Sequence, residues 1–171
     1  MTNLSVNLNK VALVRNTRNL AIPSVTKAAK ICIEAGAHGI TVHPRPDQRH
    51  IRPSDVYDLA KMLTGEFNIE GNPFQPPFMD IVREVKPTQC TLVPDAPDTF
   101  TSDRGWDLAT DASRLVPIVD QLKKLGIRVS LFMDADSTQF QQAKDLGADR
   151  VELYTEPYAA AFDRGNVEAV F

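Results

Sequence analysis

The segment at residues 39–51, GITVHPRPDQRHI, places His43, Arg45 and His50 directly after a short β-branched run. Histidine titrates near neutral pH and can move protons with little tuning of its pKa. Arginine forms charge-assisted hydrogen bonds to anions such as phosphate. We therefore expect a loop at the end of a strand that binds an anionic group beside a residue able to transfer protons.

Two carboxylates lie inside apolar runs of the same kind, Glu70 in FNIE and Glu152 in VEL. A partly desolvated carboxylate has a raised pKa, which suits it to proton transfer near neutral pH. Polar and cationic residues also follow other apolar runs, namely Asn7, Asn9, Lys10, Arg15, Arg18 and Thr101. Together these residue types indicate an enzyme that moves protons on a phosphorylated, carbonyl-bearing substrate.

Each of these residues also has another interpretation. His43 could be a core histidine bonded to a backbone carbonyl, and Glu70 could be the structural partner of an arginine. Lys10 could form a Schiff base, as lysines do in aldolases, or could contact a phosphate. A metal site is not indicated, because the chain has no CxxC spacing, and His43 and His50 share a loop rather than one helix face.

Six short apolar runs predict strands, and most of them are separated by longer segments with helical periodicity. The predicted strands are residues 4–8, 39–43, 67–70, 89–93, 128–133 and 150–154. Three segments, EAGAHGITVH, KLGIRVSLFMD and DLGADRVELYTE, share the order of a helix end, a glycine and a buried strand. Glycine after a helix supplies the left-handed residue that ends it without a steric clash. This weak repeat indicates that one βα unit is used several times.

Alternating strands and helices predict an α/β fold with a parallel sheet. About six βα units favour a TIM (β/α)8 barrel over a smaller doubly wound sheet, and no GxGxxG motif follows the first strand. A complete barrel has eight strands. We therefore expect residues 1–171 to form a single barrel domain that is incomplete at the C-terminus and lacks the last strands and helices. The active sites of such barrels lie at the carboxyl ends of the strands, where the residues named above would meet.

The formal net charge of −3 and the hydrophobic content of 43% are ordinary for a globular domain. A mildly acidic chain is not expected to bind nucleic acid or a membrane surface, since both need a basic excess. No apolar run approaches the ~20 residues that cross a bilayer, and the first ten residues lack the pattern of a signal peptide. We therefore expect a cytoplasmic protein whose ligands are small molecules and whose anion site is local.

Six blocks of the sequence together resemble the pyridoxine 5′-phosphate synthase family of deoxyxylulose-dependent vitamin B6 biosynthesis. They are VNLNKVALVRNTR, GITVHPRPDQRHI, FNIEGNP, KPTQCTLVPD, VSLFMDAD and DRVELYTEPYA, and they follow the family's order over nearly all of the chain. The resemblance implies a TIM barrel that assembles as a homo-octamer. It also implies a transferase without a metal or organic cofactor, which condenses 1-deoxy-D-xylulose 5-phosphate with 3-amino-2-oxopropyl phosphate. The products would be pyridoxine 5′-phosphate, inorganic phosphate and water.

The same resemblance implies roles for individual residues. Glu70 and His43 would be general acid/base residues, and Glu152 would assist charge development in the transition state. The contacts to 3-amino-2-oxopropyl phosphate would include Asn7 and Arg18. The contacts to 1-deoxy-D-xylulose 5-phosphate would include Asn9, Lys10, Arg45, His50 and Thr101.

The chain departs from the family pattern at Asn9–Lys10, where many members have Asp-His. The change replaces an anion and an imidazole with an amide and a permanent cation, which could tighten phosphate binding or shift proton transfer to other groups. The family's later catalytic histidine and product-phosphate loops have no counterpart in residues 1–171, so we expect turnover to need more than these residues. Two alternatives to the synthase stay open: another phosphosugar barrel enzyme, an aldolase or isomerase, and a non-catalytic protein that binds phosphate ligands.

Overall fold

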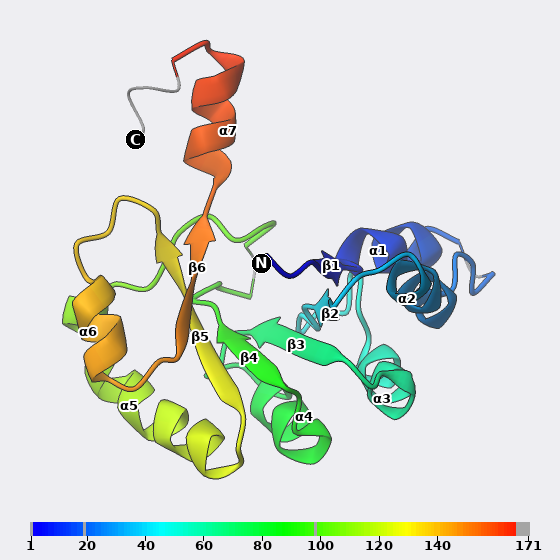
Figure 1. The fold of residues 1–171 in the computed structure, drawn as a ribbon, viewed down its shortest axis with the longest axis horizontal. Helices are drawn as coiled ribbons and strands as arrows, with labels where there is room; N and C mark the ends of the chain where they lie inside the picture. Colours follow the sequence, from blue (N-terminus) through cyan, green and yellow to red (C-terminus); the bar gives the residue numbers. More distant parts are fainter. Residues whose placement is uncertain (1, 19, 98, 167–171) are drawn as a thin grey trace.

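The structure, a computed structural model, describes residues 2–18, 20–97 and 99–166. Within these ranges six strands and seven helices follow one another along the chain (Figure 1). The strands are β1 (Ser5–Asn7), β2 (Gly39–Val42), β3 (Glu66–Gly71), β4 (Gln89–Leu92), β5 (Arg128–Asp134) and β6 (Arg150–Tyr154). The helices are α1 (Asn9–Asn16), α2 (Val25–Glu34), α3 (Pro53–Met62), α4 (Phe78–Val85), α5 (Leu108–Lys124), α6 (Phe140–Asp145) and α7 (Glu156–Asp163). Each strand predicted from the sequence is confirmed to within one residue at either end.

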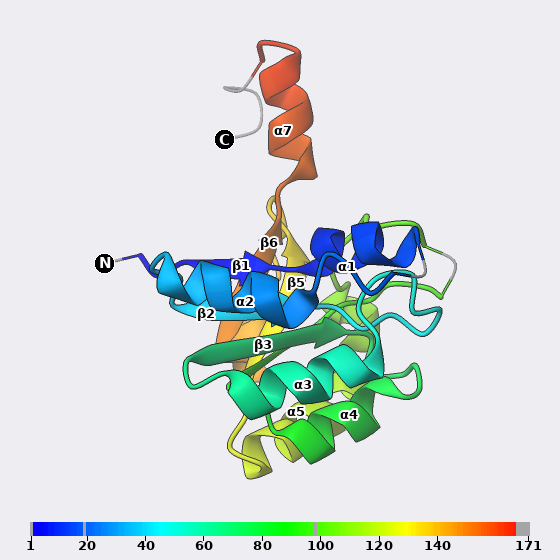
Figure 2. The ribbon, with the colours of Figure 1, turned by 90° about the vertical axis from the view of Figure 1, so that its right-hand side faces the viewer.

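The strands form one parallel sheet in the order β1-β2-β3-β4-β5-β6. A doubly wound sheet reverses its strand order at a switch point, so this sequential order confirms the incomplete barrel. The sheet curls, and α2 to α6 lie around its convex side (Figure 1). Figure 2 shows that α7 projects away from the rest of the molecule beyond β6. In the described part of the chain, β1 and β6 are the two edges of the sheet.

Alternate residues of each strand face opposite sides of this sheet. On β3, Phe67 and Ile69 pack in the hydrophobic core beneath the helices, whereas Asn68 and Glu70 line a cavity on the concave side. The core side continues on the neighbouring strands with Ile40, Val42, Cys90, Leu92, Val129, Leu131 and Met133. The concave side carries Ser5, Thr41, Gln89, Ser130, Arg150 and Glu152. The interior of this barrel is therefore polar, whereas (β/α)8 barrels usually fill it with branched apolar side chains.

The glycine repeat in the sequence ends three helices in the same way. Gly36, Gly126 and Gly147 have φ angles of 102°, 76° and 97°, in the left-handed region. In each case the glycine N–H donates to the carbonyl three residues earlier, and the next N–H donates to the carbonyl five residues before it. This is the Schellman pattern of helix ends. The three segments of the predicted repeat therefore share the same helix-ending turn before a strand.

Asn9 and Lys10, which follow the first strand, form the first turn of α1. Asn7 Oδ1 accepts a hydrogen bond of 2.8 Å from the Asn9 N–H. Such an Asx turn satisfies one of the N–H groups that have no partner at the start of a helix. The helix therefore begins at the carboxyl end of β1, and its first residues stay at the open end of the sheet.

The hydrophobic core lies between the convex side of the sheet and the helices. Leu131 on β5 is fully buried there, whereas Val151 and Leu153 on β6 are 40% and 46% exposed. Among the described residues, the convex side of the sheet is therefore buried at β5 but only partly buried at β6. Within the same ranges, no helix is long and apolar enough to cross a bilayer.

We expect Leu131→Ala to lower the free energy of unfolding of the 171-residue chain by about 2–5 kcal/mol, because it opens a cavity at a fully buried site. Leu153→Ala is the matched control on the same side of the adjacent strand. It should cost less than about 1 kcal/mol, because this side chain is already half exposed. Urea unfolding followed by circular dichroism measures both changes. Equal losses would contradict the placement of the core.

Candidate active site

The carboxyl ends of the strands surround a pocket of about 230 Å³, which we call the mouth pocket. Its lining consists of Asn7, Asn9, Lys10, Leu13, His43, Arg45, Arg49, His50, Glu70, Phe100, Thr101 and Ser102. Eight of the ten residues to which the sequence assigns roles therefore meet here, from segments up to about ninety residues apart. Parallel strands bring them together because all their carboxyl ends lie at one edge of the sheet.

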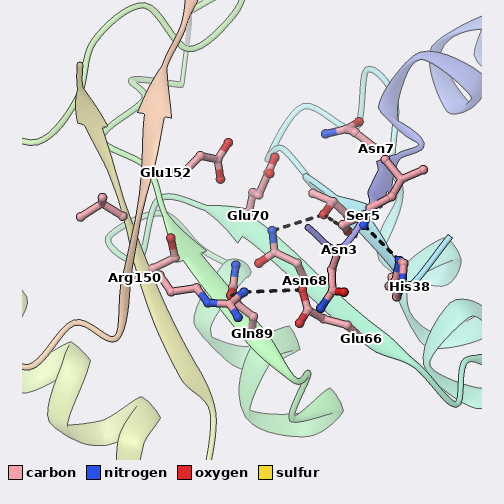
Figure 3. Close-up of a pocket in the computed structure, with 15 residues that line it drawn as sticks. Asn3, Ser5, Asn7, His38, Glu66, Asn68, Glu70, Gln89, Arg150 and Glu152 are labelled. Carbon is pink, nitrogen blue, oxygen red and sulfur yellow. Dashed lines mark hydrogen bonds and ion pairs between the residues drawn. The ribbon is translucent and has the colours of Figure 1, made fainter. Parts of the chain in front are cut away.

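A larger cavity of about 550 Å³ lies along the concave side of the sheet, and we call it the inner cavity. Asn7 and Glu70 line both cavities. Glu152 on β6 lines the inner cavity, and Figure 3 shows its carboxylate and that of Glu70 projecting into the same space. Arg18 follows α1, is exposed and lines neither cavity.

His43 and Glu70 form a buried pair at the junction of the two cavities. His43 Nδ1 lies 3.8 Å from Glu70 Oε2, and the residues are only 6% and 9% exposed. Burial, followed by the positive charge of Arg45, lowers the pKa of His43 to about 3. The imidazole is therefore neutral at neutral pH, and one ring nitrogen has a lone pair that can accept a proton.

Glu70 shares this region with a second carboxylate. Burial raises the pKa of Glu70 well above its ordinary value, the charges of Glu152 and Asp95 raise it further, and Arg45 acts in the opposite direction. Burial also raises the pKa of Glu152. Two carboxyl groups in one poorly solvated space do not both ionise readily, so the pair retains a proton at pH values where a solvated glutamate has lost it. A neutral base beside a carboxyl group that holds a proton is the arrangement that general acid/base catalysis requires.

The connection between β2 and α3 makes the rim of the mouth pocket cationic. Arg49 Nη1 donates to the Phe100 carbonyl at 2.9 Å, and Arg49 Nε donates to Asp47 at 2.6 Å. Burial and the charges of Arg45 and Arg49 lower the pKa of His50 to about 4. The positive charge around the pocket therefore comes from arginine and lysine side chains, whereas both histidines contribute neutral rings.

The Arg45 guanidinium is held from two directions. It forms an ion pair with Asp95, and Arg45 Nη1 donates to the Thr99 carbonyl at 3.1 Å. Ser102 Oγ donates to the same Asp95 oxygen at 2.8 Å. Ion pairing and hydrogen bonds thus link the cationic connection after β2 to the connection between β4 and α5. The second connection also places Thr101 in the pocket lining.

Asn9 lines the mouth pocket and also forms a hydrogen bond within the protein. Its Oδ1 accepts a hydrogen bond of 2.8 Å from the backbone N–H of His43. An aspartate would offer the same acceptor oxygen, so asparagine at this position keeps the interaction that fixes the backbone at His43. The sequence alone did not indicate this structural contact.

Arg15 does not join the anion-binding residues, contrary to the expectation from the sequence. It is 8% exposed and pairs with Asp55, and its Nη2 donates to the His50 carbonyl at 3.0 Å. The Arg15 guanidinium therefore links α1 to α3 and to the connection after β2, and it does not line the mouth pocket.

Four lining residues were not assigned roles from the sequence: Leu13, Arg49, Phe100 and Ser102. Arg49 stands among the other cationic residues of segment 43–50, which could have indicated it. No local sequence pattern marks Phe100 or Ser102. Among the described residues, no group of three or more His, Cys, Asp or Glu side chains could hold a metal ion.

Residues 4–171 match the protein family described as "Pyridoxal phosphate biosynthesis protein PdxJ". Three relatives are named pyridoxine 5′-phosphate synthase. They come from Albidiferax ferrireducens (59% identical over 170 residues), Porphyromonas gingivalis (54% over 170) and Xanthomonas campestris pv. campestris (55% over 173). The alignments cover 94%, 99% and 96% of this chain and 67%, 71% and 68% of those proteins.

Solved structures share the fold at low identity. A monomeric dihydrodipicolinate synthase variant matches with a TM-score of 0.50 at 13% identity, over 98% of this chain and 54% of that one. Protein SMc04130 from Sinorhizobium meliloti 1021 matches with a TM-score of 0.50 at 14% identity, over 90% of this chain and 63% of that one. At such identities the likeness concerns the fold alone.

We expect Glu70→Gln to raise the free energy of unfolding more at pH 8 than at pH 4.5. Because the folded-state pKa of Glu70 is raised, the folded chain keeps a proton that the unfolded chain releases above its ordinary pKa of 4.5. The stability from this group is therefore present below about pH 4.5 and is lost as the pH rises toward the folded-state pKa. Glutamine has no charge to bury at either pH, so the loss disappears.

Urea unfolding at the two pH values measures this difference. Glu34→Gln on α2, whose side chain is 63% exposed, is the control and should change stability by less than about 0.5 kcal/mol at both. An equal effect of Glu70→Gln at pH 4.5 and pH 8 would contradict the raised pKa.

Proposed function

This chain belongs to the pyridoxal phosphate biosynthesis protein PdxJ family, and we propose that it carries the pyridoxine 5′-phosphate synthase activity for which its relatives are named. The reaction condenses 1-deoxy-D-xylulose 5-phosphate with 3-amino-2-oxopropyl phosphate. It closes the pyridine ring and releases inorganic phosphate and water. The family resemblance inferred from the six sequence blocks is confirmed.

The observation that carries the proposal is the buried contact between His43 and Glu70 beside Glu152. Imine formation, dehydration and aldol-type ring closure are successive proton transfers on carbonyl compounds. A carboxyl group with a raised pKa can deliver a proton near neutral pH and take it back in the next step. We assign Glu70 and the neutral His43 to these transfers, and Glu152 to the stabilisation of charge in the transition state.

The rim of the mouth pocket supports phosphorylated substrates. Lys10, Arg45 and Arg49 line it and carry positive charge in a chain whose net charge is −3. We assign the binding of deoxyxylulose phosphate to Asn9, Lys10, Arg45, His50 and Thr101. We assign the amino-ketone phosphate to Asn7, which lines both cavities. Arg18 lines neither cavity, and we assign it to the same substrate on the family resemblance alone.

Lys10 fits a phosphate contact better than a Schiff base. The amine that forms the imine in this reaction belongs to 3-amino-2-oxopropyl phosphate itself, so no lysine has to supply one. Lys10 also lies at the exposed start of α1, among the other cations of the rim. Its ammonium group is a compact positive charge that suits attraction of an anion.

The proposal includes a single barrel domain, a homo-octameric assembly and a cytoplasmic location. Large apolar side chains are exposed around the first two helices, namely Leu4, Val14, Leu20, Ile22 and Ile31 at 56–64% exposure. Several large exposed apolar side chains in one part of the chain favour contact with further protein surface. Sedimentation analysis of the protein expressed from its complete gene tests the assembly.

We expect the protein expressed from its complete gene to form pyridoxine 5′-phosphate from the two phosphorylated substrates, and Glu70→Gln to reduce kcat by ~10²-fold or more. A positioned proton-transfer group typically contributes 10²–10⁴-fold. Mass spectrometry and ultraviolet absorbance follow the product.

Glu66→Gln is the matched control. Glu66 lies on the same side of the same strand but pairs with Arg128 at the amino end of β3. This variant should keep kcat within a few-fold of the parent, provided that circular dichroism confirms its fold. Absence of product from a folded parent would overturn the proposed synthase, and equal losses in both variants would overturn the role of Glu70.

A further inference from the structure

We propose that Asp95 is a positioning residue, whose carboxylate orients Arg45 toward the phosphorylated substrate and fixes residues 99–102 at the mouth pocket. The inference rests on the proposed function and adds to its site a residue outside the mouth-pocket lining. Asp95 acts through Arg45 and Ser102 rather than on the reacting atoms.

The first support is the charge pair itself. The side chains of Arg45 and Asp95 are 7% and 4% exposed, and they come from connections fifty residues apart. A guanidinium stays protonated in proteins, and a buried charge without a partner is strongly destabilising. Arg45 can therefore stay at the base of the pocket only with a fixed anion beside it, which Asp95 supplies.

The second support is that three connections meet at Asp95. Ser102 Oγ donates to its carboxylate at 2.8 Å. Asn72 Nδ2 and Gln75 Nε2, from the connection after β3, donate to its backbone carbonyl at 2.9 and 2.8 Å. Asp95, which lies in the connection after β4, thus contacts the connections after β2 and β3 as well. These contacts hold the three connections together beside the mouth pocket.

The geometry leaves Arg45 able to bind a ligand. Of the five N–H groups of a guanidinium, two have partners among the described residues, the Thr99 carbonyl and the Asp95 carboxylate. Three N–H groups remain, and Arg45 lines the mouth pocket. Asp95 thereby fixes the orientation of the guanidinium without occupying all of its donors.

The second carboxylate oxygen of Asp95 costs stability, and the ion pair with Arg45 offsets that cost. Asp95 Oδ1 is buried and has no hydrogen-bond partner in the described part of the chain. An unpaired buried acceptor destabilises a fold. The negative charge offsets this loss by neutralising Arg45, the cation that is paired with it.

Asp95→Asn tests the inference in the protein expressed from its complete gene. We expect deoxyxylulose phosphate to bind about tenfold or more weakly, in both Kd and KM, as when the outer partners of ligating groups are removed at metal sites. For the amino-ketone phosphate, KM should stay within about twofold of the parent value. Isothermal titration calorimetry gives the Kd, and initial rates give KM for each substrate.

A pH profile separates positioning from a general loss of structure. Among the described residues, the titratable or charged groups that interact with Glu70 are Glu152, Asp95, Arg45, His43 and the buried thiol of Cys90. Removal of the Asp95 charge takes away one cause of the raised Glu70 pKa. The basic limb of kcat/KM, along which Glu70 loses its proton, should therefore move to lower pH. A merely structural defect would lower the rate without moving this limb.

Asp103→Asn is the matched control, because Asp103 is an exposed acid in the same connection after β4. It should leave the Kd, the KM for each substrate and the pH profile unchanged. If Asp95→Asn fails to fold, Ser102→Ala serves as the second variant, with an expected rise of about threefold in the Kd for deoxyxylulose phosphate. An unchanged Kd in that variant would overturn the link to residues 99–102.

The outcomes distinguish this inference from the proposed function. A folded Asp95→Asn that matches Asp103→Asn in Kd and KM overturns the inference while turnover by the parent upholds the synthase. A parent that binds deoxyxylulose phosphate without turnover overturns the synthase, and the Kd values still decide the role of Asp95. A parent that neither turns over nor binds it overturns both.

Discussion

The alternation of side chains along parallel strands is the constraint on which the site depends. Residues that face the helices are apolar, and residues that face the interior are mostly polar, so the interior must satisfy its hydrogen bonds without apolar side chains to fill it. Ser5 and Thr41 hydroxyls lie 2.8 Å apart, Asn68 donates to Thr41 at 3.4 Å, and Thr91 donates to Asn68 at 3.0 Å. This chain of bonds crosses β1 to β4, and the inner cavity lies along it (Figure 3).

Two glutamates on one strand show how position within this interior decides chemistry. Glu66 forms ion pairs with Arg128 and Arg150 at the amino end of the sheet. Glu70, four residues later on the same side of β3, meets Glu152 and a neutral His43 instead. The first carboxylate is thereby held by cations, whereas burial and neighbouring carboxylates raise the pKa of the second. The same residue type forms structural ion pairs at one end of the strand and is the proposed proton-transfer group at the other.

The connections after the strands depend on buried charge. Arg15 with Asp55 and Arg45 with Asp95 are both buried pairs. Such pairs gain little net stability over apolar packing, but removing one partner is strongly destabilising. They therefore act mainly by making each loop conformation depend on a distant residue. In this way the loop after β2, which is rich in proline and cations, keeps one conformation at the mouth pocket.

The sequence by itself determined the strands, the helix-ending glycines and the loop that carries His43, Arg45 and His50, because these features follow from local patterns of polarity and backbone conformation. It also indicated that Glu70 would be desolvated, since the residue stands in an apolar run. Only the tertiary structure decided which arginines remain at the pocket: Arg15 pairs with Asp55 instead, whereas Arg45 and Arg49 line the pocket. It likewise decided that His43 is neutral and that Glu70 faces Glu152. Protonation and ion pairing depend on burial and on charges from distant strands, and no local pattern in the chain records those distances.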